Sequence, residues 1–207
     1  MRHLILAIAA LALSTTLPAQ NAESIISSLI NTIESKGVRC EATIRNADEP
    51  DSQGMRASLI MKGERYSLKT PESTYWYDGR NLWNGIASGD EIIEVYITEP
   101  SDEEIVTTNP FILIKRHEGF AISVSGNGAL VLKAKDRENG SNGVLSMTVR
   151  FKSDGQPSSI DVRSRVSAQM EANFSITINK YETGNVSDSE FNYPKSKWPD
   201  AQVIDLR

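Results

Sequence analysis

The stretch Tyr66–Ile114 constrains the fold of this chain more than any other, because it forms strands and then abruptly stops forming them. Three aromatic residues, Tyr75-Trp76-Tyr77, run into a turn at Asp78-Gly79, and an apolar run resumes at Leu82-Trp83. The segment Ile92–Ile97 supplies a further strand. Apolar runs bounded by such turns are typical of β-hairpins. The helical signals that follow must therefore be placed on a sheet.

Two helix starts interrupt the strands. The residues Ser101–Glu104 have the Ser-x-x-Glu form of a capping box, in which the hydroxyl and the carboxylate satisfy free amides. The pair Asn109-Pro110 ends this first helix and can open a second, with Asn as cap and Pro at the first helical position. The second helix begins Phe111-Ile112-Leu113-Ile114 and is apolar on every side. A surface helix would show a single apolar stripe, so this helix must be covered all round or must face an apolar ligand.

A leading helix comes before the sheet, capped at Asn21 and closed by Lys36-Gly37. Apolar residues recur at helical spacing along one of its faces: Ile25, Ile26, Leu29, Ile30 and Ile33. From Val38 the pattern alternates with period two, which indicates strands. Further strands are expected over Gly54–Lys62, Tyr66–Lys69, Ala121–Ser125, Leu130–Ala134, Val144–Phe151, Ser158–Arg165 and Asn173–Tyr181.

The expected fold class is α+β, mainly β. About ten strands in an antiparallel sheet should curl toward an open, incomplete β-barrel because of their twist. The tail that ends in Val203–Arg207 is interrupted by Pro194 and Pro199, which is typical of a sheet edge. Helices should lie on the concave side, where they either complete a solid core or cover a ligand cavity.

The first nineteen residues have the pattern of a secretory signal peptide. Arg2 and His3 precede the apolar run Leu4–Leu13, and Leu17-Pro18-Ala19 fits a cleavage site. The run is too short to span a membrane. We therefore expect an exported protein, cleaved near Ala19, with one domain over residues 20–207.

The sequence offers little for chemistry. Beyond the signal peptide it has one histidine, His117, and the whole chain has one cysteine, Cys40, so a catalytic triad, a multi-histidine metal site and an internal disulfide are excluded. No glycine-rich phosphate loop follows a strand. The formal net charge of −5 and the lack of a basic cluster argue against nucleic acid or an anionic membrane surface as partners. We expect no enzyme, no cofactor and no metal.

Three motifs give the chain a resemblance to a known family. The turn from Tyr77 to Trp83 reads Asp-Gly-x-x-Leu-Trp at its centre, a strand ends in Ile97-Thr98-Glu99-Pro100, and a helix begins Asn109-Pro110-Phe111. With these motifs the chain resembles the outer-membrane lipoprotein carrier family, LolA, and its closing Val203–Arg207 resembles members from the Bacteroidetes.

The resemblance implies a periplasmic, monomeric carrier. An open, incomplete β-barrel closed by helices would shelter the acyl chains of lipoproteins on their way to the outer membrane. Its implied partners are acylated lipoproteins, an inner-membrane lipoprotein-releasing complex and an outer-membrane acceptor. Two alternatives stay open: a periplasmic sensor or regulator domain of the same fold, and a binding protein for a small apolar ligand.

One departure from the family concerns how the helices are held. Many members carry an Arg-Pro pair near Met61, whose arginine helps to hold the helical lid, whereas this chain reads Lys62-Gly63-Glu64-Arg65. The role of that arginine does not transfer to Lys62 or Arg65.

Alternation and the inserted helix select the residues expected to contact acyl chains. A shift of one residue in register would exchange the two faces and make Trp76 the inward residue in place of Tyr75 and Tyr77. The predicted lining residues are Leu59, Met61, Tyr66, Leu68, Tyr75, Tyr77, Trp83, Phe111 and Leu113.

Overall fold

The computed structural model describes residues 22–207 except 50, 52, 137, 142 and 168, so the predicted signal peptide and the predicted cap Asn21 lie outside the described residues. The helices are α1 (Ala22–Ser35), α2 (Asp102–Thr108) and α3 (Ile112–Lys115), with 3₁₀ turns η1 (His117–Gly119) and η2 (Asp188–Phe191). The strands are β1 (Val38–Asn46), β2 (Met55–Lys62), β3 (Arg65–Lys69), β4 (Ser73–Tyr77), β5 (Leu82–Ser88), β6 (Glu91–Thr98), β7 (Phe120–Val124), β8 (Leu130–Ala134), β9 (Val144–Phe151), β10 (Pro157–Ser167), β11 (Met170–Thr183) and β12 (Gln202–Asp205). Of these helices, none is long and apolar enough to cross a membrane.

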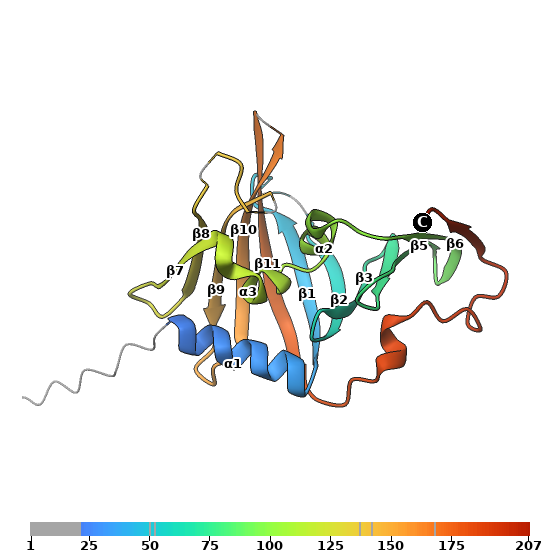
Figure 1. Cartoon of the computed structure of the whole chain (residues 1–207), viewed down its shortest axis with the longest axis horizontal. Coiled ribbons are helices and arrows are strands. Elements are labelled where there is room, and N and C mark those ends of the chain that lie inside the picture. The colour runs from blue at the N-terminus through green and yellow to red at the C-terminus, as the bar shows by residue number, and fades with distance from the viewer. Residues whose placement is uncertain (1–21, 50, 52, 137, 142, 168) are drawn as a thin grey trace, which may run out of the picture.

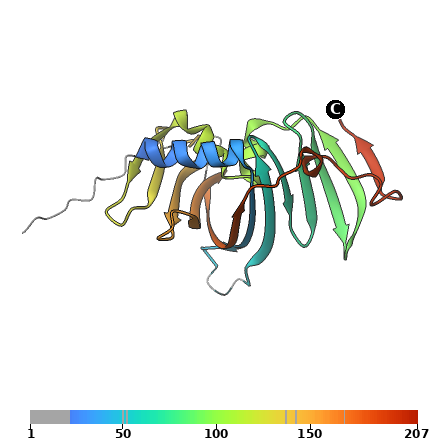
Figure 2. The ribbon, with the colours of Figure 1, turned by 90° about the horizontal axis from the view of Figure 1, so that it is seen from below.

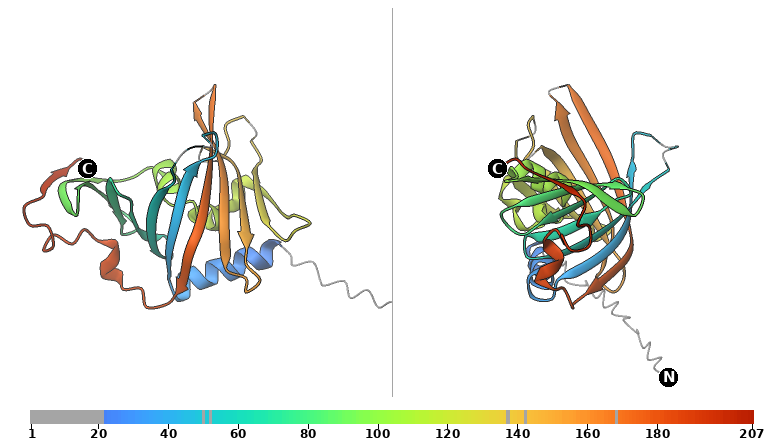
Figure 3. Two further views of the ribbon diagram at one scale, coloured as in Figure 1. Left: turned by 180° about the vertical axis from the view of Figure 1, so that it is seen from behind. Right: turned by 90° about the vertical axis from the view of Figure 1, so that its right-hand side faces the viewer.

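All twelve strands belong to one sheet, in the order β12-β6-β5-β4-β3-β2-β1-β11-β10-β9-β8-β7. Neighbouring strands are antiparallel except β12, which pairs with β6 in parallel. The sheet is strongly twisted and curled but does not close, because β12 and β7 remain as edges (Figures 1 and 3). The predicted class, an open, curled α+β fold that is mainly β, is confirmed, with β12 as an edge strand.

The helices lie on the concave face of this sheet (Figure 2 and the right-hand view of Figure 3). Helix α1 contacts α3, β2 and β7, and therefore spans much of the concave face. It ends as the sequence predicts: Gly37 has a φ of +72°, and its N–H donates to the carbonyl oxygen of Ile33 at 3.2 Å. A Cβ at Gly37 would lie 2.7 Å from Val186, so glycine is required both by the left-handed backbone and by this contact.

The sheet has an apolar cluster on each face. The larger one fills the space between the concave face and the helices, with residues from α1, α2, α3 and nearly every strand. The smaller one lies on the outer face around Trp76, Ile92 and Val95, and Tyr193 and Trp198 pack on it. The segment between β11 and β12 therefore crosses the outer face before the chain reaches its last strand (Figure 2).

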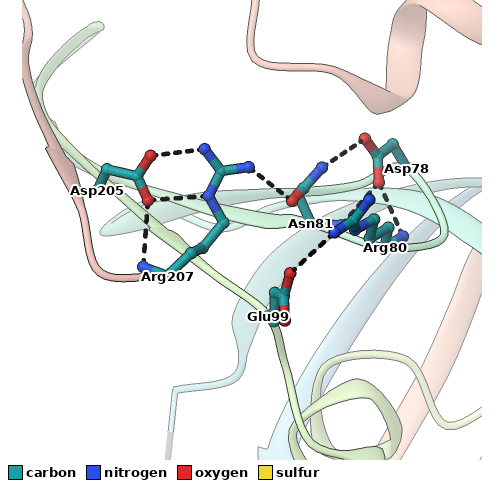
Figure 4. Close-up of polar contacts among 6 residues, drawn as sticks. All are labelled: Asp78, Arg80, Asn81, Glu99, Asp205 and Arg207. Carbon is teal, nitrogen blue, oxygen red and sulfur yellow. Dashed lines mark hydrogen bonds and ion pairs between the residues drawn. The ribbon is translucent and has the colours of Figure 1, made fainter.

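The C-terminal residues are held at the turn between β4 and β5 (Figure 4). Arg207 binds the carboxylate of Asp205 and donates from Nη1 to Oδ1 of Asn81 at 2.9 Å. Asn81 in turn donates to Asp78, whose Oδ1 also accepts the backbone N–H of Arg80 at 2.8 Å. The closing residues of the chain thus stabilise the Asp-Gly turn. Since these side chains are largely exposed, each contact contributes little on its own.

Candidate functional site

The concave face beneath the helices is the candidate functional site. Residues that are directly opposite in neighbouring strands share a face of the sheet. The register aligns Met61, Tyr66, Tyr77 and Leu82 in one row across β2 to β5. The rings of Tyr66 and Tyr77 lie 5.4 Å apart, centroid to centroid, and all four side chains are buried.

A second row runs beside the first on the same face. It consists of Leu59, Leu68 and Tyr75, which are paired across β2, β3 and β4. Leu59 is buried in the concave-face cluster, while Leu68 and Tyr75 are half-buried and pack against it. The inner face is therefore apolar beyond the part that the helices cover.

The structure brings eight of the nine predicted lining residues to this cluster, and Trp83 is the exception. Because Tyr77 pairs with Leu82, Leu82 is the inward residue of β5, and Trp83 points to the outer face opposite Trp76. The prediction for Trp83 was wrong because alternation within a strand does not give the offset across a hairpin turn. Tyr75 and Tyr77 are the inward residues of β4, as expected, and Trp76 is not.

The helical cover, residues Asp102–Arg116, consists of α2, α3 and the Asn109–Phe111 link. Ser101 and Glu104 form the predicted capping box at the start of α2. The segment Phe111–Ile114 is buried on all sides, and Leu113 and Ile114 are fully inaccessible. This explains why the sequence of that short helix shows no polar face.

The closed arrangement leaves almost no free volume where α1, α3 and β2 meet. The gap lined by Ile30, Met61, Phe111 and Ile112 measures about 10 Å³. A void of this size holds at most about one water molecule. An acyl chain could therefore reach the concave face at this place only if the cover moves.

Two polar contacts hold the cover to the sheet and to itself. The hydroxyl of Tyr66, in β3, hydrogen-bonds with the hydroxyl of Thr108 at the end of α2. The fully buried Asn109 accepts the backbone N–H of Phe111 with its Oδ1 at 3.2 Å. Asn109 ends α2, as predicted, but the prediction that it caps the second helix with Pro110 at the first helical position was wrong, because α3 starts at Ile112 with Phe111 as its N-cap.

A charged network, which we call the latch, ties the cover to both the sheet and α1. Glu64, in the turn between β2 and β3, accepts from Arg116 at 2.7 Å and lies 3.5 Å from Nζ of Lys115. Lys115 also pairs with Glu34 of α1 at 2.8 Å, and Arg116 with Asp102 of α2 at 2.5 Å. Four of these five side chains are between a quarter and a half exposed, while Asp102 is more exposed. The latch joins three helical segments to the sheet through the single carboxylate of Glu64.

The electrostatics of the latch favour its charged form. Burial alone would raise the pKa of Glu64, but the hydrogen bonds and charges of Arg116 and Lys115 outweigh it and lower that pKa from its ordinary value. The hydrogen bond to Glu34 raises the pKa of Lys115. For Arg116, burial lowers the pKa, and the bonds to Glu64 and Asp102 more than compensate.

Sequence reasoning did not find the latch. Its two signals were visible: the run Lys115-Arg116 directly after an apolar helix, and Glu64 in the place where the family carries an Arg-Pro pair. In this network the sheet carries the carboxylate and the cover carries the cations. No local pattern shows that these residues meet.

The cover leaves one end of the concave face open. Met55 is the partner of Ile44, and Phe174 is the partner of the inward-facing Val162, so both side chains lie on the inner face. Met55 is 41% exposed and Phe174 is 36% exposed, which is unusual for large apolar residues on the concave, helix-covered face of a sheet. Exposed apolar surface next to a covered apolar face marks a place where apolar material can enter.

Other chemistry is sparse in the described part of the chain. Within those residues, no cluster of three or more His, Cys, Asp or Glu side chains is placed to hold a metal ion. Cys40 is free and buried in β1, and burial raises the pKa of its thiol to about 12. A thiol in that environment is unreactive.

The architecture defines a class: an incomplete β-barrel whose apolar concave face is closed by helices. The family model described as outer membrane lipoprotein carrier protein LolA matches residues 13–169. The chain belongs to this LolA-like family.

The solved structures to which the chain is similar are distant in sequence. A LolA superfamily protein from Nitrosomonas europaea is 14% identical, with 84% of this chain and 98% of that chain covered and a TM-score of 0.41. A DUF1329 family protein from Desulfovibrio piger is 10% identical, with 83% and 96% covered and a TM-score of 0.44. The MucA/MucB complex from Pseudomonas aeruginosa contains a chain that is 11% identical, with 88% and 63% covered and a TM-score of 0.39. No curated protein shows significant sequence similarity.

Proposed function

We propose that this protein is a periplasmic carrier that shelters the acyl chains of lipoproteins on its concave face and delivers them to the outer membrane, without a chemical step. Members of the LolA-like family are periplasmic, and its family model covers most of this chain. Acylated lipoproteins are the proposed cargo. The donor would be an inner-membrane lipoprotein-releasing complex and the acceptor an outer-membrane component, and the carrier itself would act as a monomer.

The observation that carries this proposal is a continuous apolar face under a cover held by few polar contacts. Eight of the predicted residues lie in the concave-face cluster, where they form two rows and the underside of the cover. The cover is tied down by the Tyr66–Thr108 hydroxyl pair and by the partly exposed latch. Partly exposed ion pairs are weak, so a cargo that offers comparable apolar contact can displace the cover.

The energetics of the cargo fit this design. Each exposed CH₂ costs about 0.8 kcal/mol in water, so an acyl chain of some fifteen carbons costs roughly 12 kcal/mol. A carrier must offset much of this cost and still release the chain. An apolar face that the cover occupies when no cargo is bound can both hold and release the acyl chain, because the cover and the acyl chain compete for the same apolar contacts.

The proposal is tested by native mass spectrometry of the protein purified from periplasm. We expect a fraction of the molecules to carry a lipoprotein, with its acyl chains bound, at one cargo per monomer. In parallel, an environment-sensitive fatty-acid probe should bind the empty protein and be displaced by free fatty acids. A folded protein that carries no lipoprotein and binds no probe at micromolar concentration would contradict the proposal.

A further inference from the structure

The hairpin formed by β10 and β11 projects beyond the rest of the sheet (Figures 1 and 3). On one side, β1 ends at Asn46, which pairs with Phe174 of β11. On the other side, β9 begins at Val144, which pairs with Ser164 of β10. Beyond these two pairs, no described strand pairs with the hairpin on either side. We call this projecting part, residues 165–167 and 169–172, the ribbon.

The ribbon carries large apolar side chains that are exposed. Val166 is 55% and Met170 is 54% exposed. Met55 and Phe174, at the open end of the concave face, lie at the base of the ribbon. In the described part of the chain, these four make up most of the seven large apolar residues that are exposed. Single exposed apolar residues are normal, but a concentration of them at one end indicates a contact surface.

The apolar side of the ribbon continues the concave face. Alternate residues of a strand share a face, so Met170 and Ala172 lie on the same side of β11 as Phe174. Phe174 is paired with Val162, which belongs to the concave-face cluster. Farther along β10, Ile160 is fully buried in that cluster. A largely apolar strip therefore leads from the exposed ribbon into the concave face.

The other side of the ribbon is charged, and its charges are paired. Glu171 binds Arg163 at 2.5 Å and Arg165 at 3.2 Å. Next to the ribbon, Arg45 and Arg56 flank a loop whose carboxylates offset them: Asp48, Glu49 and Asp51. The ribbon and the loop beside it thus carry both signs of charge in balance. This balance gives no advantage to an anionic partner and suits a zwitterionic surface.

Size and charge together indicate the kind of partner. A stable protein interface takes about 20–30 residues a side, far more than the ribbon offers. Contact with the interfacial layer of a bilayer needs only a few apolar side chains next to polar ones. We propose that the ribbon dips Val166 and Met170 into the surface of a zwitterionic lipid membrane, so that the apolar strip joins the membrane to the concave face.

The purpose of this contact rests on the proposed carrier function, because an acyl chain that moves along the strip avoids water between the membrane and the concave face. The contact itself is weak. A single myristoyl chain gives only marginal, reversible membrane binding, and the side chains of Val166 and Met170 together are smaller than such a chain. Weak binding suits a carrier, which must leave the membrane again with its cargo.

The first test uses the buried thiol of Cys40, the one cysteine of the chain. Because that thiol is unreactive in the folded protein, a cysteine introduced at an exposed position can be labelled alone with a polarity-sensitive dye. In the full mature protein, the dye on Met170→Cys should shift its emission to the blue when phosphatidylethanolamine/phosphatidylcholine vesicles are added at about millimolar lipid. Ser123→Cys, at an exposed position of the edge strand β7, is the matched control and should show no shift.

Vesicle co-sedimentation provides a second readout that needs no label. The double variant Val166→Ser/Met170→Ser should bind the same vesicles at least tenfold more weakly than the wild type, because two apolar side chains are lost from the lipid contact. The control Ile93→Ser/Leu206→Ser removes two apolar residues that are 47% and 61% exposed at the β6–β12 end of the sheet. It should bind as the wild type does.

The proposal is overturned if the dye on Met170→Cys does not respond to these vesicles, if it responds only to anionic vesicles, or if the two double variants bind equally. Shielding of the dye by a periplasmic protein in place of vesicles would assign the ribbon to a protein partner and overturn it as well.

A further control separates the ribbon from the concave face. Excess fatty acid, which would fill the concave face, should leave the dye shift unchanged. Loss of the shift would mean that the concave face itself holds the vesicle lipid, which would also overturn the proposal. The vesicles contain no lipoprotein, so failure of lipoprotein or fatty-acid binding alone would count only against the carrier function.

Discussion

Neutralising Glu64 should open the cover without unfolding the protein. In the variant Glu64→Gln the side chain keeps its size, but the carboxylate that binds both Arg116 and Lys115 is lost. Neither cation is left without a partner, because Arg116 keeps Asp102 at 2.5 Å and Lys115 keeps Glu34 at 2.8 Å. The loss is therefore that of a partly exposed ion pair and not that of a stranded buried charge.

The expected magnitude follows from this geometry. Exposed ion pairs contribute about 0.2–1 kcal/mol, and the two contacts of a one-third-exposed Glu64 place the loss near the upper end, about 1 kcal/mol. For a domain of this size such a loss lowers the melting temperature by about 2–4 °C. Because the latch exists only in the closed state, the same loss raises the open fraction, and thus the apparent affinity for an acyl probe, about fivefold.

The assay compares fatty-acid probe binding and thermal melting in the wild type, Glu64→Gln and Asp161→Asn. The control removes the ion pair of Asp161 with Arg150 on the outer face, a similarly exposed contact at 2.5 Å that lies away from the cover. We expect the control to change the melting temperature slightly and the probe affinity not at all. If Glu64→Gln lowers the melting temperature but leaves the affinity equal to that of the control, the latch does not govern access to the concave face.

Three other predictions address the cover, its pH dependence and the core. Phe111→Glu should abolish lipoprotein transfer but keep a cooperative melting transition, since a carboxylate in this apolar contact must stay hydrated and displace the cover. The control Ile160→Glu, in the fully buried centre of the sheet, should unfold the domain. A collapsed melting transition for Phe111→Glu would show that Phe111 belongs to the core and not to a movable cover. The pKa of Glu64 is lower in the folded protein than its ordinary value of about 4.3. The carboxylate therefore stabilises the closed state fully at a pH above about 4.3, and this contribution is lost as the pH falls through the lower, folded-state pKa. Probe affinity should accordingly rise at acid pH in the wild type and rise less in Glu64→Gln. The thiol of Cys40, whose pKa is raised to about 12 by burial, should not react with a thiol reagent at pH 8 until denaturant is added, and rapid labelling of the native protein would contradict its placement in the core.

The sequence predicted what depends on local periodicity and turns. Alternation located the strands, the Ser-x-x-Glu pattern located the start of α2, and Lys36-Gly37 located the end of α1. The all-round apolar pattern of Phe111–Ile114 correctly indicated burial on every side.

What the sequence could not provide depends on contacts between distant segments. The face of Trp83 depends on the offset of one hairpin, which alternation leaves free. The latch joins Glu34, Glu64 and Lys115 from three separate elements, and no spacing rule connects them. The aromatic cluster on the outer face was equally hidden, because it forms only when Trp198 packs on Trp76 from a distant part of the chain.

The position of β1 also bears on how this protein folds. The first strand of the chain lies inside the sheet, where Val38 pairs with Met61 on one side and with Thr183 on the other. In a chain that is synthesised from its amino end, one edge of β1 stays unpaired until almost everything else has emerged. Helix α1 cannot dock fully before then, because it contacts β2 and β7 in the two halves of the sheet that the β1–β11 pairing joins. Such long-range pairing is slow and leaves strand edges open to aggregation. The arrival of β11 is therefore expected to limit how soon the closed sheet centre and the docked α1 can form.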